Sequence, residues 1–316
     1  MKIFVIIVTY NAMRRKWIDR CLQSLRNSAI PVFPVVIDNH STDETTKHIQ
    51  NYYPEVHLIT NKENRGFGQA NNQGIEYAYC QGATHFFLLN QDAWIKTDTI
   101  SHLIEVQDKY HLGLVSPIHL TGGGDRLDLG FYRFICKSKQ GITFLSDLIL
   151  HKDDTKDFYD IEEVNAAAWF LDKKTIDTIG GFDPVFFHYG EDDNFLCRLR
   201  YHHIRSGIVP KAFIHHDRSD DHGNEKIYHA HQALNKLLCS FSDVNQSAWP
   251  FTKYRMKTIA SHAILFIKML FSLHIHEAWL IIRDYTLFLL KIRTVIRHKH
   301  INQTVGLHWL NLEKGK

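Results

Sequence analysis

Short apolar runs alternate with segments of helical spacing through the first half of the chain. Four of these runs are rich in Val, Ile and Phe, a composition typical of buried strands. They span residues 3–8, 32–37, 56–60 and 85–89. Between the first two, apolar residues recur from Trp17 to Leu25 at the spacing of one helix face. This alternation predicts an α/β protein whose parallel sheet is wound by right-handed crossovers.

A cluster of polar residues follows each of the four predicted strands. Ligands of parallel α/β sheets bind beyond the carboxyl ends of the strands. The clusters therefore predict a binding site at that edge of the sheet. They are Thr9-Tyr10-Asn11, residues 38–43, residues 61–68 and Asn90-Gln91-Asp92.

The second and third clusters contain the first candidates for ligand binding. Asp38 stands at the end of a strand, where its oxygens can accept hydrogen bonds from a base or a ribose. Asp43 also fits the N-cap of the following helix. The glycines of residues 64–68 let the backbone approach a ligand. Their spacing is neither that of a Walker phosphate loop nor that of a dinucleotide fingerprint.

Asp92 ends a strongly apolar strand and faces the predicted ligand edge. A carboxylate at this position suits Mg²⁺ or Mn²⁺, which take oxygen ligands and often use one or two protein carboxylates together with phosphates. A second candidate ligand follows the strand predicted over residues 208–214, where His215 and His216 come in succession. Adjacent strand residues point to opposite faces, so at most one of these histidines can reach the metal. An imidazole beside a carboxylate favours Mn²⁺.

Residues 191–193 are three consecutive carboxylates ahead of an apolar-periodic run at residues 195–199. Acidic side chains suit the positive end of a helix, and a carboxylate with a fixed direction can act as a general base. A solvated helix start is the alternative interpretation. The Gly180-Gly181 turn and the apolar pair Phe186-Phe187 favour an acidic group held at the edge of a pocket.

Composition narrows the class of protein. The length of 316 residues and the hydrophobic content of 44% allow one large domain with an appendage. Five cysteines without paired spacing indicate reduced thiols. The apolar start at residues 3–8 is too short for a signal-peptide core, and no uninterrupted apolar run reaches about 18 residues. We therefore expect a cytoplasmic protein.

Charge divides the chain into a main domain at residues 1–248 and an extension at residues 249–316. Residues 251–316 hold eleven Lys and Arg against three Asp and Glu, a balance of +8 that leaves −5 for the remainder. A mildly acidic body does not fit a nucleic-acid binder. In the extension, apolar residues alternate with Lys and Arg, which is typical of helices on an anionic membrane surface. Packing on the main domain and a homodimer interface are the alternatives.

Five ordered motifs give the chain a resemblance to a known family. They are Val8-Thr9-Tyr10-Asn11, residues 38–43, residues 64–68, Leu89-Asn90-Gln91-Asp92 and the segment from Gly180 to Asp192. In order and spacing they resemble the inverting glycosyltransferases of family 2 over roughly residues 1–240. The resemblance implies a GT-A catalytic domain over residues 1–248, with a Rossmann-like central mixed sheet, and a C-terminal helical extension. It is closest to the bacterial enzymes that build O-antigen, capsule and exopolysaccharide, including many rhamnosyltransferases.

The resemblance also implies roles for matching positions on the donor side. The donor nucleotide would contact Thr9, Tyr10, Asn11, Asp38, Asn39, Asp43, Asn64, Arg65, Gly66 and Gln91. Asp92 would bridge a divalent cation, Mn²⁺ or Mg²⁺, to the diphosphate. His216 matches the late metal-binding histidine of the family. Asn90 stands at the first position of the metal motif and leaves Asp92 as its only carboxylate.

On the acceptor side, the resemblance makes Asp192 the general base, with Glu191 as its neighbour or alternate. Asp183 would contact the acceptor, although Pro184 stands where the family often has Glu. Trp169 follows the small residues at 166–168 and is a candidate platform for a sugar ring. A core strand is the alternative interpretation for Trp169.

We therefore expect transfer of a sugar from a UDP- or dTDP-linked donor to a hydroxyl of a glycan or lipid-linked glycan, with inversion, in bacterial surface polysaccharide synthesis. The extension would contact the cytoplasmic face of the inner membrane. A nucleotidyltransferase is the alternative enzyme, but Thr9-Tyr10-Asn11 is not the basic phosphate loop expected of it. A catalytically degenerate partner in glycan assembly is the non-enzyme alternative, and the intact acids Asp38, Asp92 and Asp192 argue against it.

Overall fold

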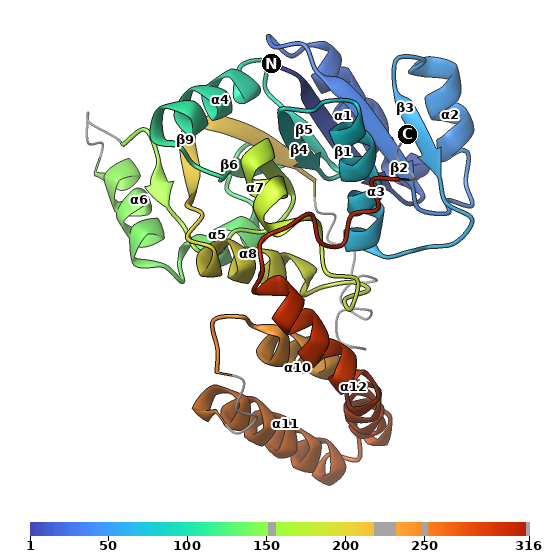
Figure 1. Cartoon of the computed structure of the whole chain (residues 1–316), viewed down its shortest axis with the longest axis vertical. Helices are drawn as coiled ribbons and strands as arrows, with labels where there is room; N and C mark the ends of the chain where they lie inside the picture. The colour runs from blue at the N-terminus through green and yellow to red at the C-terminus, as the bar shows by residue number, and fades with distance from the viewer. Residues whose placement is uncertain (151–155, 218–231, 248–251, 314–316) are drawn as a thin grey trace.

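The computed structural model describes residues 1–150, 156–217, 232–247 and 252–313. Within these residues a mixed sheet of nine strands forms the centre of the larger part of the molecule (Figure 1). The strands run in the order β3-β2-β1-β4-β8-β6-β9-β5, and β7 pairs with β9. Their bounds are β1 Ile3–Thr9, β2 Phe33–Asp38, β3 His57–Thr60, β4 His85–Leu89, β5 Ala93–Ile95, β6 Leu114–Thr121, β7 Tyr159–Asp160, β8 Ala168–Asp172 and β9 Ser206–His216.

The four strands predicted from the apolar runs form one half of this sheet. β1 lies between β2 and β4 and is parallel to both, and β2 is parallel to β3. The register pairs Thr9 with Asp38 and Asp38 with Thr60, so the carboxyl ends of these strands meet at one edge. β8 is antiparallel to β4 and β6, whereas β9 is parallel to β6. The expected α/β fold with a mixed central sheet is therefore confirmed.

Alternation of side chains along the strands divides the core into two layers. On β1, Phe4 and Ile6 belong to one hydrophobic cluster, whereas Val5 and Ile7 belong to the other. Residues of α3 and α8 complete the first cluster, and residues of α1 and α4 complete the second. The helices around the sheet are η1 Ala12–Arg15, α1 Trp17–Arg26, α2 Thr45–Tyr52, α3 Phe67–Cys80, α4 Thr99–Tyr110, α5 Leu129–Ile135, α6 Lys139–Ile149, α7 Lys173–Ile179 and α8 Glu191–Tyr201.

Three further helices form a unit that extends away from the sheet (Figure 1). They are α10 Gln232–Ser242, α11 Lys253–Phe271 and α12 Ile275–Asn302. A third hydrophobic cluster joins Leu237 of α10 to Phe288 and Val295 of α12, and to Phe186 of the loop before α8. The predicted boundary at 248/249 lies outside the described residues. α10 comes before that boundary in the sequence but packs with the helices that follow it.

The chain after α12 returns to the main domain as an irregular segment with turns, residues 303–313, which we call the C-terminal strap (Figure 1). It is held by hydrogen bonds from Gly181 N to His308 O (2.9 Å), Gly306 N to Thr178 O (2.9 Å), Asn72 Nδ2 to Trp309 O (3.2 Å) and Asn311 N to Glu76 Oε1 (2.7 Å). The expectation of a separate extension did not include this return. Among the described residues, no helix is long and apolar enough to cross a membrane.

Candidate active site

The carboxyl ends of β1 and β2 form the first part of the candidate active site. Asn39 N donates to Thr9 O (2.8 Å), and Thr9 Oγ1 donates to Asp38 Oδ1 (3.3 Å). The other carboxylate oxygen of Asp38 accepts from Ser41 N (3.0 Å). Asp38 is buried, so these neutral donors hold its carboxylate in one orientation at the ligand edge.

The loop after β1 is tied to two other predicted donor-binding segments. Tyr10 N donates to Gln91 Oε1 (2.9 Å), while the Tyr10 ring stays exposed. Asn11 adopts a left-handed conformation with φ 51°, and its side-chain oxygen accepts from Thr42 N (2.8 Å). Asp43 accepts from Met13 N (3.2 Å). These contacts bring Tyr10, Asn11, Asp43 and Gln91 together around one loop.

Asn39 connects β2 to the loop before α3. Its Nδ2 donates to Asn64 Oδ1 (2.9 Å), and its Oδ1 accepts from Arg65 N (2.9 Å). Gly66 has φ 80°, and a Cβ atom there would lie 1.9 Å from the carbonyl oxygen of Phe187. Only glycine fits this approach. The loop predicted to bind the donor is therefore in direct contact with the loop predicted to bind the acceptor.

The two predicted metal ligands lie next to one another. β5 pairs with β9 so that Ala93 stands opposite His216, which brings the imidazole to Asp92. His216 Nε2 lies 3.4 Å from Asp92 Oδ1. His215 points to the other face, where its ring stacks on Trp94 at 5.5 Å between centroids. Of the two candidate histidines, the geometry thus places His216 beside Asp92.

The donor set at Asp92 and His216 fits a divalent cation. A carboxylate and an imidazole are ligands that Mn²⁺ accepts, and a diphosphate and water would complete the coordination. Among the described residues, no group of three or more His, Cys, Asp or Glu side chains is placed to hold a metal. Asp128 Oδ2 lies 3.6 Å from His216 Nδ1, on the far side of the ring. This separation is longer than a hydrogen bond, and Asp128 Oδ1 accepts from Phe131 N (2.8 Å) at the start of α5.

The predicted base lies in the first turn of α8. Gly190, with φ 93°, precedes the helix, and Glu191 and Asp192 are its first two residues. Glu191 is buried, and this burial, together with the nearby Asp192, raises its pKa to about 8. Glu191 is therefore mostly protonated at neutral pH, whereas Asp192 is half-buried at the surface.

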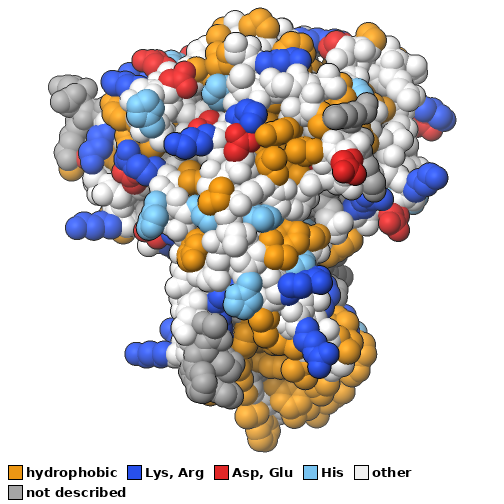
Figure 2. Space-filling view, viewed as in Figure 1, with side chains coloured by type: hydrophobic (Ala, Val, Ile, Leu, Met, Phe, Trp, Pro, Cys, Tyr) orange, Lys and Arg blue, Asp and Glu red, His pale blue; other side chains and the backbone are white. Residues whose placement is uncertain are grey.

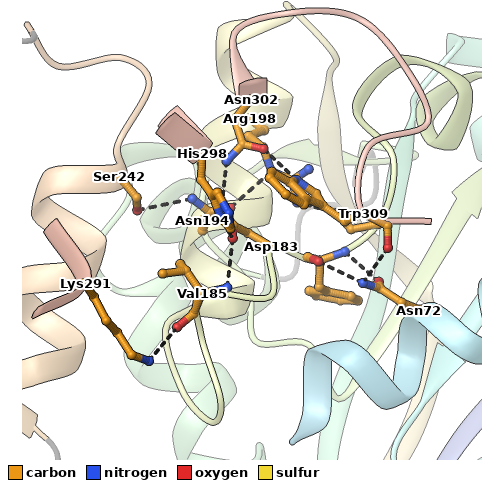
Figure 3. Close-up of polar contacts among 12 residues, drawn as sticks. Asn72, Asp183, Val185, Asn194, Arg198, Ser242, Lys291, His298, Asn302 and Trp309 are labelled. Atoms are coloured by element: carbon orange, nitrogen blue, oxygen red, sulfur yellow. Dashed lines mark hydrogen bonds and ion pairs between the residues drawn. The ribbon is translucent and has the colours of Figure 1, made fainter. Parts of the chain in front are cut away.

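The structure places Asp183 in a buried network with α12 (Figure 3). Its Oδ1 accepts from His298 Nδ1 (2.6 Å) and Val185 N (2.9 Å), and its Oδ2 accepts from Asn302 Nδ2 (2.8 Å). Arg198 holds the preceding Gly-Gly turn by donating to the carbonyl of Gly181 (2.7 Å). Acceptor contact by Asp183 stays a prediction, because in this conformation both carboxylate oxygens bind the chain itself.

Trp169 is also enclosed. It lies on β8 with no exposed surface, and its ring packs against Phe182 and Phe195 at centroid distances of 6.2 and 5.5 Å. A sugar could stack on this ring only if the ring left the core. The alternative interpretation, a core strand, matches this placement, and the platform role stays a prediction.

The sequence did not predict the residues that contact the candidate site residues from other parts of the chain. Asp128, His298 and Asn302 each contact a predicted site residue but come from segments without a recognisable motif. A lone aspartate, histidine or asparagine gives no local signal of such a contact.

The order of the sheet, the polar edge at β1 and β2 and the acidic start of α8 are together those of a GT-A glycosyltransferase. The family model for glycosyl transferase family 2 matches residues 4–161, half of the chain. The chain belongs to this family, as its motifs predicted. Membership of this family identifies the protein as a glycosyltransferase and excludes the alternative of a nucleotidyltransferase.

Two relatives are similar over most of the chain. The dTDP-rhamnosyl transferase RfbF of Shigella flexneri is 26% identical over 69% of this chain and 70% of its own length. The low-salt glycan biosynthesis hexosyltransferase Agl10 of Haloferax volcanii is 21% identical over 75% of this chain and 76% of its own length. Both are sugar transferases.

Solved structures share the fold. TarS 1-349 of S. aureus in complex with UDP aligns with a TM-score of 0.51 at 17% identity, over 75% of this chain and 66% of that one, slightly under two thirds. The mannosyltransferase PcManGT of Pyrobaculum calidifontis in complex with GDP-Man and Mn²⁺ aligns with a TM-score of 0.54 at 17% identity, over 96% and 85%. At these identities the likeness establishes the GT-A fold alone.

Proposed function

We propose that this protein transfers a sugar from a nucleotide diphosphate sugar to a hydroxyl of a glycan or lipid-linked glycan, with inversion and with help from Mn²⁺ or Mg²⁺. The observation that carries this proposal is the 3.4 Å approach of His216 Nε2 to Asp92 Oδ1. The two residues lie far apart in the sequence and meet next to the ligand edge of the sheet. A bound cation there would neutralise charge on the leaving diphosphate.

In the proposed reaction, Asp192 is the base that accepts the proton of the acceptor hydroxyl. An acceptor hydroxyl is a poor nucleophile, and removal of its proton by a positioned carboxylate contributes about 10²–10⁴ in rate. The raised pKa of Glu191 favours Asp192 as the base, because a base must be ionised before it accepts a proton. The hydroxyl would attack the anomeric carbon opposite the leaving diphosphate, and a single displacement inverts the configuration.

We propose a UDP- or dTDP-linked donor and a role in bacterial surface polysaccharide synthesis. RfbF is named for a dTDP-linked sugar, and TarS binds UDP, so both use pyrimidine nucleotides. PcManGT binds GDP-Man, so binding of GDP must be compared with binding of UDP and dTDP. Titration calorimetry with UDP, dTDP and GDP, with and without Mn²⁺, tests the proposal. Tighter binding of one pyrimidine nucleotide in the presence of Mn²⁺ is expected, and the absence of nucleotide binding under all conditions would contradict it.

We also propose that the helical unit contacts the cytoplasmic face of an anionic membrane. Figure 2 shows hydrophobic side chains gathered over the helical unit at the lower end of the molecule. On α11, α12 and the turn between them, the most exposed hydrophobic residues are Ile264, Phe271, Leu273, Leu289 and Leu290. Because residues 251–316 also carry a balance of +8, anionic lipid is the surface that complements both properties. A second copy of the chain is the alternative occupant, and sedimentation with vesicles distinguishes the two.

A further inference from the structure

A polar cavity of about 480 Å³ lies between α3, the start of β3 and the C-terminal strap, and only its end at Arg65 borders the candidate active site. Its lining extends from Arg65, just before α3, to Gln81, just after it. At 1.5 Å per residue, the 14 residues of α3 give this wall a length of about 21 Å. The strap contributes Trp309 and Asn311 to the wall.

The wall formed by α3 is polar although it is partly enclosed. The lining residues of this helix are Gln69, Asn72, Gln73, Glu76 and Tyr77. They are spaced by three or four positions and therefore share one face of the helix. The apolar residues Ala70, Ile75 and Ala78 face the core instead. An ordinary polar helix face is open to solvent, whereas this one shares a cavity with the C-terminal strap.

Some of these polar side chains form hydrogen bonds within the protein, and others do not. Asn72, Gln73 and Glu76 form hydrogen bonds with neighbouring residues. In the described part of the chain, no hydrogen bond uses the side-chain amides of Gln69 and Gln81, although both line the cavity. These two amides can therefore bind a ligand without breaking a contact.

Two aromatic side chains complete the lining. The Tyr77 ring stacks on His57 with centroids 3.7 Å apart. Trp309 has a φ of 68°, a left-handed conformation that bulky residues rarely adopt. Its Nε1 donates to Asn302 Oδ1 (2.7 Å), which fixes the indole at the cavity.

The cavity carries little net charge. Arg65 and Glu76 have opposite signs, and burial lowers the pKa of His57, which keeps its ring neutral at neutral pH. A ligand rich in phosphate would need several cations in the wall. Amides both donate and accept hydrogen bonds, as sugar hydroxyls do. The unused amides of Gln69 and Gln81, together with the small net charge, therefore favour a neutral carbohydrate.

We propose that this cavity binds the sugars of the acceptor glycan that do not react. The inference rests on the proposed function, because the cavity must deliver a hydroxyl to Asp192. Arg65 and Pro184 line the cavity, and both are in loops that border the candidate active site. The contact between Gly66 and Phe187 joins these two loops at that end. An acceptor chain lying along α3 would thus point its terminal sugar toward the base.

Saturation-transfer NMR tests the inference without requiring catalysis. The probes are short oligosaccharides of rhamnose, glucose, galactose, mannose or N-acetylhexosamine. The variant Gln69→Trp fills the cavity, and the double variant Gln69→Ala and Gln81→Ala removes the two unused amides without adding bulk. Gln50→Trp, at an exposed position of α2, is the matched control. Binding of UDP and dTDP with Mn²⁺ is measured on the same samples.

The expected result is transfer to at least one oligosaccharide with the unmodified protein. Transfer should be about tenfold weaker in both cavity variants, and it should be unchanged in Gln50→Trp, with nucleotide affinity unchanged throughout. Equal transfer in all variants overturns the inference, because the sugar then binds elsewhere. Nucleotide binding without transfer to any oligosaccharide overturns the inference and leaves the proposed function standing. Failure of nucleotides to bind rejects the proposed function and this inference with it.

Discussion

His298 Nδ1 lies 2.6 Å from Asp183 Oδ1, and both side chains are buried (Figure 3). Asp183 begins the loop that leads to α8, and His298 belongs to the last turns of α12. Lys291 Nζ, also on α12, donates to Val185 O in the same loop (3.3 Å). The helical unit therefore fixes the segment that carries Glu191 and Asp192.

Replacing His298 by Ala should lower the free energy of unfolding by about 2–3 kcal/mol, because it removes a donor from a buried carboxylate. Urea denaturation measures this change. His300→Ala, at an exposed position of the same helix, is the control and should change stability little. Equal stability of the two variants would show that Asp183 does not depend on His298.

Asp92→Ala should remove the support that Mn²⁺ gives to binding of UDP or dTDP, because Asp92 is the only carboxylate of its motif. Calorimetry with and without Mn²⁺ measures the effect. Circular dichroism should be unchanged, since the side chain lies at the ligand edge. Nucleotide affinity that still rises with Mn²⁺ would count against Asp92 as a ligand.

Asp128→Asn should weaken Mn²⁺ binding by about tenfold, because it removes a buried negative charge close to His216. The observation behind this prediction is the 3.6 Å separation of Asp128 Oδ2 and His216 Nδ1. Electron paramagnetic resonance of Mn²⁺ gives the affinity directly. Asp125→Asn, in the same loop but exposed, is the matched control. Equal affinities in the two variants would leave Asp128 with a purely structural role.

Asp192→Asn should reduce turnover by about 10² or more, because the amide keeps the size of the side chain but cannot accept a proton. Donor affinity should stay near that of the unmodified protein, since the metal site is unchanged. Glu191→Gln should cost less activity. If Glu191→Gln loses more activity than Asp192→Asn, Glu191 is the base and Asp192 its supporting neighbour.

Glu191 also predicts a pH dependence of stability. Its pKa rises from 4.5 to about 8 on folding, so the folded protein keeps a proton that the unfolded chain loses. The stabilisation of the folded state by this proton is complete below pH 4.5. It is lost as the pH rises to about 8, at a rate of up to ~1.4 kcal/mol per pH unit. Urea midpoints across this range should fall less steeply in Glu191→Gln, which has no proton to lose. Parallel pH profiles would contradict the prediction.

Changing Phe271, Leu289 and Leu290 together to Ser should reduce sedimentation with anionic vesicles at least about tenfold, because each apolar side chain contributes about 1.5–3 kcal/mol when buried. These residues are 87%, 66% and 76% exposed, so the fold should tolerate the change. Ile149→Ser, on an exposed position of α6, is the control. A protein that fails to bind vesicles but forms dimers would favour the second copy as occupant.

Local patterns in the sequence predicted what depends on neighbouring residues. The periodicity of β1, β2 and β4 located the strands, and the polar residues after them predicted a ligand edge. The partners of Asp183 could not be found in this way, since His298 lies 115 residues further along the chain. Nor could the burial of Trp169, because an apolar strand residue beside small neighbours fits a core and a binding surface equally well.

The C-terminal strap has a consequence for the synthesis of the protein. Asn72 of α3 receives its partner Trp309 only after 237 further residues have been made. Until then, the nascent chain can form most of the sheet, but the turn at Gly181 and the acidic start of α8 lack their final supports. Translation therefore passes through an incomplete domain, and premature termination before the strap would yield a chain with its sheet formed and its transferase centre unfinished.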